Sequence, residues 1–348
     1  MRAKLQVTPI RQSGFSMVEL MVALVLGLFL TTAVLQTFIS AKETYEFQQE
    51  LSAIQENGRF AMTFLTKDIR AADFWGCMAD GDGSASTSIQ SILSGAASSN
   101  VFAAGVAGFN KVPAASTGYT AWFGGTAQPD AIVLQGARDS GITVDKVPST
   151  TNPNIHLSST DGIKKGDILL VSDCSEGVMF QVTDTPNPSD KIILHNQNGG
   201  SVNETPGNKQ NGLGIIFDDS ATVFQAESIR YWIRAGVSGE PALIRGTETD
   251  AWTAGDELVE GVENIQFLYG VDLNDDKTAN YFVDADVVNA AGDMDKVVSI
   301  QVHLVVRSFR DNMVEPTLID FYGGPKSVND HRMRKIFVST IAIRNRLD

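Results

Sequence analysis

The first pattern along the chain is a long apolar run near the N-terminus. From Leu20 to Ala41 there are 22 residues without a charged side chain. As a helix rising about 1.5 Å per residue, this run would be about 33 Å long, which is enough to cross a bilayer. Basic residues precede it at Arg2, Lys4 and Arg11. That asymmetry predicts a cytoplasmic N-terminus and export of the remainder.

The helical pattern continues beyond the apolar run. Residues 42–72 contain no proline. Small or apolar residues recur there in steps of three and four, at Phe47, Leu51, Ile54, Gly58, Ala61, Leu65, Ile69 and Ala72. Such spacing places these side chains on one face of a helix. We therefore expect a transmembrane helix over 15–41 that continues over 42–76 as an amphipathic helix packed on the protein's own globular domain.

The rest of the chain changes to the period of β-strands. Its clearest strand is Lys296–Ser308, where every second residue from Val298 to Val306 is apolar. Short β-branched runs bounded by Gly, Pro, Asn or Asp predict further strands at Ile132–Gln135, Asp167–Asp173, Val178–Thr183, Lys191–His195, Glu227–Arg234, Ala242–Arg245 and Val262–Val271. A last strand is predicted at the C-terminus, with Ile336, Val338, Thr340, Ala342 and Arg344 on one face. A long helix packed on antiparallel sheet belongs to the fold class α+β.

One segment follows neither pattern. Residues 80–128 are dominated by Gly, Ala, Ser and Thr, with few large apolar residues. We expect a surface excursion there, with a short helix around Ile89–Leu93. It lies within the globular domain, which is expected to span residues 77–348.

Composition limits the classes of function. The formal net charge is −14, and residues 1–14 carry three basic and no acidic side chains, so a chain without them would carry −14 − 3 = −17. An acidic surface argues against nucleic acid as a partner, because binding to its phosphates needs a positively charged surface. The most basic short segment, 330–335, is interpreted as a solvated turn that leads into a strand.

A short motif, Gly14-Phe15-Ser16-Met17-Val18-Glu19, stands directly before the apolar run. One interpretation of the whole region is a plain membrane anchor. A second is a secretory signal, but its apolar core would be about 7–15 residues long and would end at a small-residue cleavage site. The run here is longer and has no clean site of that kind. As a third interpretation, the motif resembles the type III signal of type IV prepilins.

That resemblance implies specific processing. A prepilin peptidase would cleave between Gly14 and Phe15, which removes a leader of residues 1–14, and would N-methylate Phe15. A carboxylate beside a membrane span costs about 2.5–3.5 kcal/mol on insertion scales, so Glu19 needs a partner. The resemblance implies that Glu19 pairs with the N-terminal amine of a neighbouring subunit in the filament. In a plain anchor it would be a carboxylate at headgroup level without a role.

Several later stretches resemble the PilW-type minor pilins. They are Gln55–Phe60, Phe74–Cys77, Gly166–Cys174, Val262–Gly270 and Arg334–Asn345. The resemblance implies a minor pilin that takes part in type IV pilus biogenesis, within a tip or priming complex that initiates pilus assembly. Alternatives are a minor pseudopilin of type II secretion, or a membrane-anchored periplasmic adhesin or enzyme.

The resemblance also implies partners and a location. The partners would be other minor pilins and the major pilin, the prepilin peptidase and the inner-membrane assembly platform, with a large tip adhesin as a further candidate. The chain would first be a single-pass inner-membrane protein with a periplasmic globular domain, and then part of the pilus, at its tip. Motility, adhesion and DNA uptake all remain open as purposes of that pilus.

The family resemblance supports a disulfide between Cys77 and Cys174, the two cysteines of the chain. Both follow the anchor and would lie in an oxidising compartment. The bridge would tie the end of the helix to a strand, and in the chain-entropy model a loop of this size stabilises by about 4–5 kcal/mol. Two separate buried thiols are the alternative.

The sequence contains few motifs that indicate catalysis or metal binding. The four histidines, His156, His195, His303 and His331, do not have the spacing of a metal site, and neither a G-x-S-x-G elbow nor a P-loop is present. We therefore predict no enzymatic activity and no cofactor. Exposed aromatics could indicate sugar binding, with Trp122, Trp232 and Trp252 as candidates, but we interpret them as core residues.

One loop has a partial calcium pattern. Asp272, Asn274 and Asp276 place oxygen ligands at positions one, three and five, as in an EF-hand loop. Lys277 replaces the glycine at position six, and Val283 replaces the glutamate at position twelve. A solvated acidic turn is therefore preferred over a calcium site.

Overall fold

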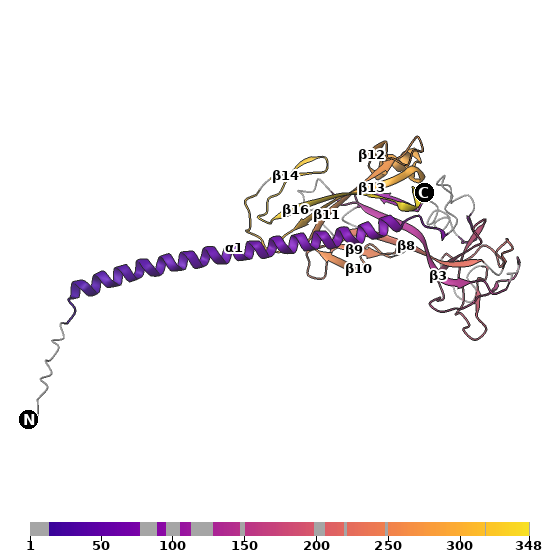
Figure 1. The fold of residues 1–348 in the computed structure, drawn as a ribbon, viewed down its shortest axis with the longest axis horizontal. Helices are drawn as coiled ribbons and strands as arrows, with labels where there is room; N and C mark the ends of the chain where they lie inside the picture. Colours follow the sequence, from indigo (N-terminus) through magenta and orange to yellow (C-terminus); the bar gives the residue numbers. More distant parts are fainter. Residues whose placement is uncertain are drawn as a thin grey trace, which may run out of the picture. The chain divides into compact units, whose positions relative to one another are not determined.

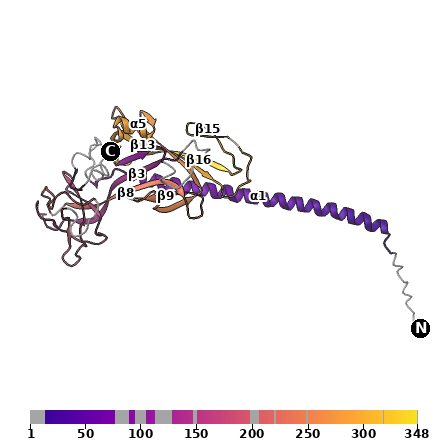
Figure 2. The ribbon, with the colours of Figure 1, turned by 180° about the vertical axis from the view of Figure 1, so that it is seen from behind.

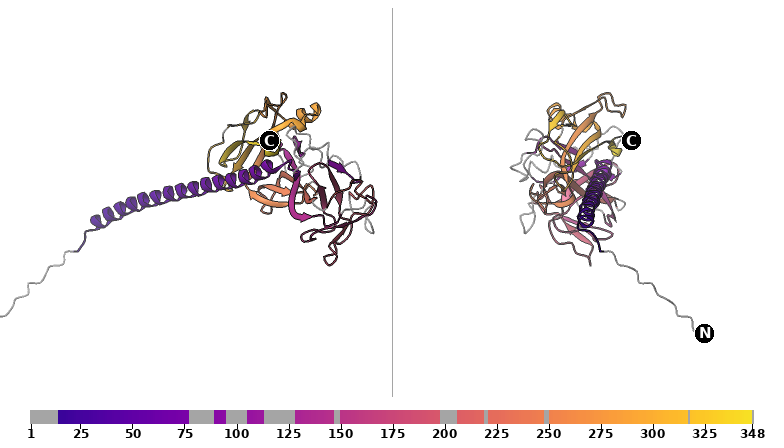
Figure 3. Two further views of the ribbon diagram at one scale, coloured as in Figure 1. Left: turned by 45° about the vertical axis from the view of Figure 1, so that its right-hand side comes forward. Right: turned by 90° about the vertical axis from the view of Figure 1, so that its left-hand side faces the viewer.

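The structure is a computed structural model that describes residues 14–76, 89–94, 105–112, 128–146, 150–197, 206–218, 221–247, 250–316 and 318–347. The chain divides into two compact units, Met1–Ser52 and Ala53–Asp348, called here the N-terminal and C-terminal units. One helix, α1 (Met17–Ala71), contributes residues to both units (Figures 1 and 3). The helical pattern of the sequence is confirmed over this range.

The larger sheet of the C-terminal unit has eight strands. Its order is β1-β6-β5-β8-β3-β2, and β9 pairs with both β8 and β10. All pairs are antiparallel except β1 with β6. The strands are β1 (Ile89–Ser91), β2 (Val106–Phe109), β3 (Ala131–Thr143), β5 (Ile168–Ser172), β6 (Gly177–Gln181), β8 (Thr222–Ala235), β9 (Pro241–Gly246) and β10 (Asp256–Glu260).

A second sheet of four antiparallel strands has the order β12-β11-β13-β16. These strands are β11 (Val262–Val271), β12 (Tyr281–Val283), β13 (Val297–Arg307) and β16 (Arg334–Ala342). Among the described residues there are also two two-stranded sheets, β4 (Asn154–His156) with β7 (Ile192–Leu194) and β14 (Leu318–Phe321) with β15 (Gly324–Ser327). The short helices in this part of the chain are α5 (Ala285–Ala291), η2 (Met294–Lys296) and η3 (Arg344–Arg346). Figure 2 shows α5, β15 and β16 from behind.

The fold class α+β is confirmed. Each run predicted as a strand contains or overlaps one. The half-buried alternation predicted for β13 is wrong, because Ser299 and Arg307 are buried together with the apolar residues, and only Gln301 and His303 are partly exposed. The short helix expected around Ile89–Leu93 is wrong, because Ile89–Ser91 form strand β1 beside β6. Short apolar runs do not distinguish helix from strand by period alone. Within the expected excursion at 80–128, β2 also pairs with β3, and Val106 on it is fully buried.

Two local interactions join the sheets near the start of β3. Asp130 donates its N–H to the Ile265 carbonyl of β11 at 2.9 Å. Its buried carboxylate accepts N–H groups from Lys111 and from Phe267, both at 3.0 Å. Burial raises the pKa of Asp130 to about 7, although these two hydrogen bonds act in the opposite direction.

Candidate processing site and assembly surface

The predicted cleavage site lies in an exposed segment before the helix. Gly14, Phe15 and Ser16 have no regular secondary structure, and Phe15 is 88% exposed. No atom lies within 4 Å of the position that a Cβ on Gly14 would take. An exposed, irregular peptide bond is the kind of bond that a peptidase can reach. The 13 residues before Gly14 lie outside the described residues.

Ser16 and Glu19 form a capping box at the start of α1. The Ser16 hydroxyl accepts the Val18 N–H at 3.3 Å, and Glu19 Oε2 accepts the Ser16 N–H at 3.1 Å. This arrangement satisfies two of the helix's unpaired N–H groups. Within the monomer, Glu19 therefore already has a local role that the sequence analysis did not assign. Its S-x-x-E spacing could have revealed that role.

The first part of α1 exposes its apolar side chains. Every residue from Gly14 to Thr44 is exposed, and α1 contains a segment long and apolar enough to cross a membrane. Its threonines do not need outside partners, because Thr31, Thr32, Thr37 and Thr44 each donate a hydroxyl to the carbonyl four residues earlier. Polar residues satisfied in this way are tolerated inside lipid.

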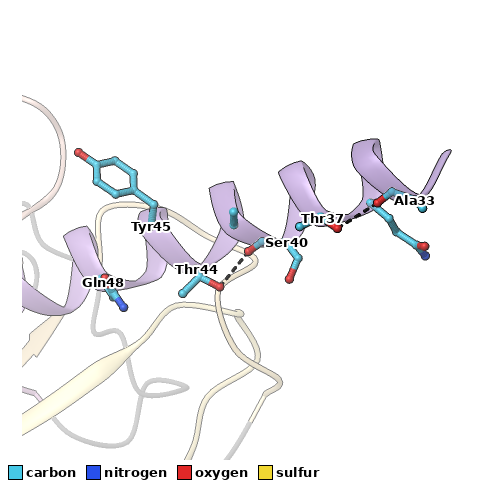
Figure 4. A pocket seen from close by; sticks show the side chains of 8 residues that line it. Ala33, Thr37, Ser40, Thr44, Tyr45 and Gln48 are labelled. Atoms are coloured by element: carbon cyan, nitrogen blue, oxygen red, sulfur yellow. Dashed lines mark hydrogen bonds between the residues drawn. The ribbon is translucent and has the colours of Figure 1, made fainter. Parts of the chain in front are cut away.

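On one face of this exposed segment the side chains are smaller and more polar than on the rest of it. It forms a shallow groove along α1 lined by Ala33, Gln36, Thr37, Ser40, Ala41, Thr44, Tyr45 and Gln48. Figure 4 shows these side chains on successive turns, with the Thr37 and Thr44 hydroxyls bonded back to the helix. Small side chains allow close approach of another helix in a membrane.

The last five turns of α1 pack on the sheets. Of the residues predicted to lie on one buried face of the helix, those within the C-terminal unit are buried: Ile54, Gly58, Ala61, Leu65, Ile69 and Ala72. Phe47 and Leu51 precede that unit. Gly58 lies so close to the Phe337 ring of β16 that a Cβ would come within 2.2 Å of it. Asp68 accepts the Tyr231 hydroxyl at 2.6 Å and lies 3.2 Å from Arg245 Nε. These contacts attach α1 to both sheets.

Residues near the C-terminus close the end of α1. Asn345 donates its amide to the Ala72 carbonyl at 2.9 Å. Arg346 pairs with Asp73 at 2.5 Å and also donates to the carbonyls of Met294 and Val297. The last carbonyls of a helix have no partner within the helix, so Asn345 acts as a cap supplied from a distant part of the chain.

Residues 330–335 lead into β16 as expected, but they are not simply solvated, because the Arg334 side chain is buried in an ionic network. Arg334 makes paired hydrogen bonds both to Glu263, at 2.6 and 2.9 Å, and to Asp330, at 2.5 and 2.7 Å. Arg332 and the buried Arg307 reach Glu240, at 3.2 and 2.6 Å. The charges are not solvated because each guanidinium of β13 and of the segment leading into β16 has a carboxylate on a neighbouring strand or turn.

The predicted disulfide involves a residue outside the described part of the chain. Cys77 is not described, and Cys174 follows β5 in a turn with φ 73°. The turn is closed by Asp173, whose carboxylate accepts the N–H groups of Ser175 and Glu176 at 2.9 Å. The bridge between Cys77 and Cys174 stays a prediction.

The Asp272 loop folds on its own carboxylates. Asp272 accepts N–H groups from Asn274, Asp275 and Lys277, at 3.1, 2.8 and 2.7 Å. The amide of Asn274 donates to Asp276 at 3.0 Å. Burial acts to raise the pKa of Asp272, but the backbone hydrogen bonds outweigh it and lower that pKa. A calcium ion would have to share these oxygens with the loop's own N–H groups, and a calcium site stays the less favoured, untested interpretation.

The described residues contain no group of three or more His, Cys, Asp or Glu side chains that could hold a metal ion. His195 is fully buried against Phe180, and His303 contacts Gln301 at 2.9 Å on β13. Trp232 is fully buried, Trp252 is partly buried, and Trp122 lies outside the described residues.

Comparison with known proteins adds two family matches. The model of the Type IV Pilus-assembly protein W family matches residues 230–345, and the model of the prokaryotic N-terminal methylation motif matches residues 10–35. No curated protein and no solved structure matches the chain. The first match covers β9 to β16 with the buried ionic network, and the second covers the capping box and the exposed apolar helix. The predicted resemblance to PilW-type pilins is confirmed.

Proposed function

We propose that this chain, which carries the features of a PilW-type pilin of the type IV pilus, is a minor pilin of a tip or priming complex that initiates pilus assembly. The observation that carries the proposal is the N-terminal methylation motif directly before an exposed apolar helix. That helix continues without a break into the spine of a β-rich domain. A plain anchor does not need this continuity.

The capping box suggests how processing prepares the chain for assembly. After cleavage behind Gly14, the new amine of Phe15 would lie one residue before Ser16, whose N–H is bound to Glu19. A neighbouring subunit's amine would be a better partner for Glu19, because both groups of an ammonium–carboxylate pair are charged, whereas the Ser16 N–H is a neutral donor. Pairing would also offset the cost of a carboxylate in lipid, about 2.5–3.5 kcal/mol, and would thereby favour subunit association.

The proposed location and partners follow from this pathway. The chain enters the inner membrane with its N-terminus cytoplasmic and its globular domain periplasmic, is cleaved and methylated by the prepilin peptidase, and is taken up by the assembly platform. Other minor pilins and the major pilin then pack around α1. A globular domain of this size is easier to accommodate at a tip than along a shaft, which favours a tip position and contact with a large adhesin.

The first experiment determines the N-terminal residue of the mature protein by mass spectrometry, in cells with and without the prepilin peptidase. We expect N-methylated Phe15 only when the peptidase is present. Gly14→Val should block this processing. Gly27→Val is a matched control, because the space around both glycines is open. A mature chain that starts at Met1, or beyond about Ala33, would contradict the proposal.

A second experiment separates the pilus from type II secretion. Deletion of the protein should reduce the number of surface pili and leave secretion of exoproteins unchanged. Glu19→Val should reproduce the pilus defect although its N-terminus is still processed. Loss of secretion with intact pili would instead indicate a minor pseudopilin.

A further inference from the structure

Strand β16 forms a long open edge of the four-stranded sheet. Among the described residues it is hydrogen-bonded to β13 alone, in a register without a shift from Arg307–Arg334 to Ser299–Ala342. α1 reaches β16 through Phe337, at Gly58. The β14–β15 hairpin lies beside it through Ile336, which packs with Val305, Phe321 and Val328. Neither element pairs with the free edge.

The direction of the free backbone groups follows from two hydrogen bonds. Ile343 donates its N–H to the Val298 carbonyl at 2.9 Å, and Ser308 donates to the Met333 carbonyl at 2.8 Å. Hydrogen-bonded and non-hydrogen-bonded pairs alternate in an antiparallel ladder. With an unbroken register, the odd-numbered residues of β16 therefore point their N–H groups at β13. The N–H groups that point to the open edge belong to Ile336, Val338, Thr340 and Ala342.

The other edges are protected in ways that β16 is not. On the larger sheet, β10 is five residues long, carries Asp256, Glu257 and Glu260, and has a register shift after Glu257. The edge strands β1, β2 and β12 have three, four and three residues. Charges, bulges and short length are the usual means of blocking an edge. β16 has nine residues, and from Ile336 to Ala342 it has neither charge nor proline.

Side chains at the edge indicate the chemistry of a partner. Val338 is 54% exposed, and Thr340 beyond it is exposed as well. Lys335 and Arg344 are exposed at the two ends of this apolar stretch, on a chain whose net charge is −14. A strand with apolar residues at alternate positions and acidic residues at its ends would match both features.

We propose that β16 receives an extended, acid-flanked segment of another pilus subunit, which adds as a fifth strand to the four-stranded sheet. This inference rests on the proposed function and names the surface by which the C-terminal unit holds its neighbour. Main-chain hydrogen bonds to the outward N–H groups provide the attachment, and Val338 and Thr340 provide the side-chain contact.

The test is photo-cross-linking in cells that express the full chain and assemble pili. A photoreactive residue replaces Thr340, and a control chain carries it at Val237, which is 93% exposed in the turn between β8 and β9. We expect a product from position 340 that mass spectrometry identifies as a different pilus subunit, joined through a segment that contains Asp or Glu. A product from position 340 no stronger than that from position 237, or one joined to a second copy of this chain, would overturn the proposal.

A pair of variants tests the backbone contact. Val338→Pro removes an outward N–H and leaves the hydrogen bonds to β13 in place, which edge strands tolerate. Val338→Thr keeps that N–H and serves as the matched control. We expect loss of the cross-link from position 340 in Val338→Pro and its retention in Val338→Thr. Retention in both would overturn the proposal.

Two controls keep the outcomes separate. Protease resistance shows whether Val338→Pro is folded, and if it is not, the comparison of positions 340 and 237 decides alone. The mature N-terminus is determined in the same cells. A chain processed at Phe15 that lacks the cross-link contradicts this inference only, whereas an unprocessed chain contradicts the proposed function.

Discussion

Helix α1 has two parts that use apolar residues differently. From Met17 to Ile39 the large apolar side chains are more than half exposed, on every side of the helix. From Ile54 to Ile69 the buried residues lie on one face, and Asp68 faces Tyr231 and Arg245. The first part suits lipid or the helices of other subunits, and the second is already occupied by the protein's own sheets. Substitutions should therefore affect folding in one part and membrane or assembly behaviour in the other.

The largest expected effect compares two leucines. Leu65 is fully buried and Leu30 is 71% exposed. Leu65→Ala should lower the free energy of unfolding by about 2–5 kcal/mol, through lost burial and the cavity left behind. Leu30→Ala should leave that free energy unchanged. Urea unfolding of the full chain in detergent, followed by tryptophan fluorescence, checks this, because the four tryptophans lie at or beyond Trp75 in the C-terminal unit. Equal losses in both variants would show that the two parts do not differ.

Acid should change the stability of the C-terminal unit through two buried groups with opposite signs, whereas residues 20–41 of α1 carry no titratable side chain. In the C-terminal unit, burial lowers the pKa of His195 to about 4 and raises that of Asp130 to about 7. The unfolded histidine takes up a proton near pH 6.5, so its contribution to stability is lost as the pH falls from 6.5 to 4. Asp130 gains stability over a similar range, because its folded state binds the proton first.

The two contributions can be separated by substitution. Relative to the wild type at each pH, Asp130→Asn should lose stability on acidification from pH 7 to 4.5, because it lacks the stability that the wild type gains when Asp130 takes up its proton. The full span of the histidine effect is about 3 kcal/mol. His195→Leu should gain stability relative to the wild type over the same range. Urea unfolding at several pH values measures both slopes, and identical slopes in the two variants would contradict the assignment.

The smallest effect compares two glycines of the same helix. A Cβ on Gly58 would meet the Phe337 ring, whereas one on Gly27 would meet no atom within 4 Å. Gly58→Ala should lower the free energy of unfolding by about 1–3 kcal/mol through overpacking. Gly27→Ala should raise helix stability by about 0.5–1 kcal/mol, because alanine loses less backbone entropy on folding. Circular dichroism and urea unfolding of the full chain distinguish these outcomes, and a stabilising Gly58→Ala would mean that Phe337 moves aside at little cost.

Much of this architecture could be predicted from periodicity. The buried positions of α1 from Ile54 onward follow from spacing alone, because this part of the helix buries one face. The spacing along β13 predicted a strand but not its burial, because β13 lies between β11 and β16 and buries Ser299 and Arg307 as well. The motif that contains Gly14, Phe15 and Glu19 was also visible, since its residues lie close together in the sequence, and its processing stays a prediction. The buried Arg334 was not visible, because its partners Glu263 and Asp330 come from different segments and a charged residue in a strand is normally solvated. The hydrophobic pattern also could not show that β16 lies at the edge of its sheet, because edge position depends on the order of the strands in space.

The closure of α1 by Asn345 and Arg346 has a consequence for the timing of folding. These residues are separated from their partners Ala72 and Asp73 by 273 positions in the chain. Synthesis proceeds from the N-terminus, so the helix is complete long before its cap exists. Until the C-terminal residues have been synthesised, the apolar face of α1 from Ile54 to Ile69 is only partly covered by the sheets. It depends on contacts between residues far apart in the sequence, which form slowly. A chaperone would therefore protect this chain most after α1 has been synthesised and before Asn345 and Arg346 bind its C-terminal end.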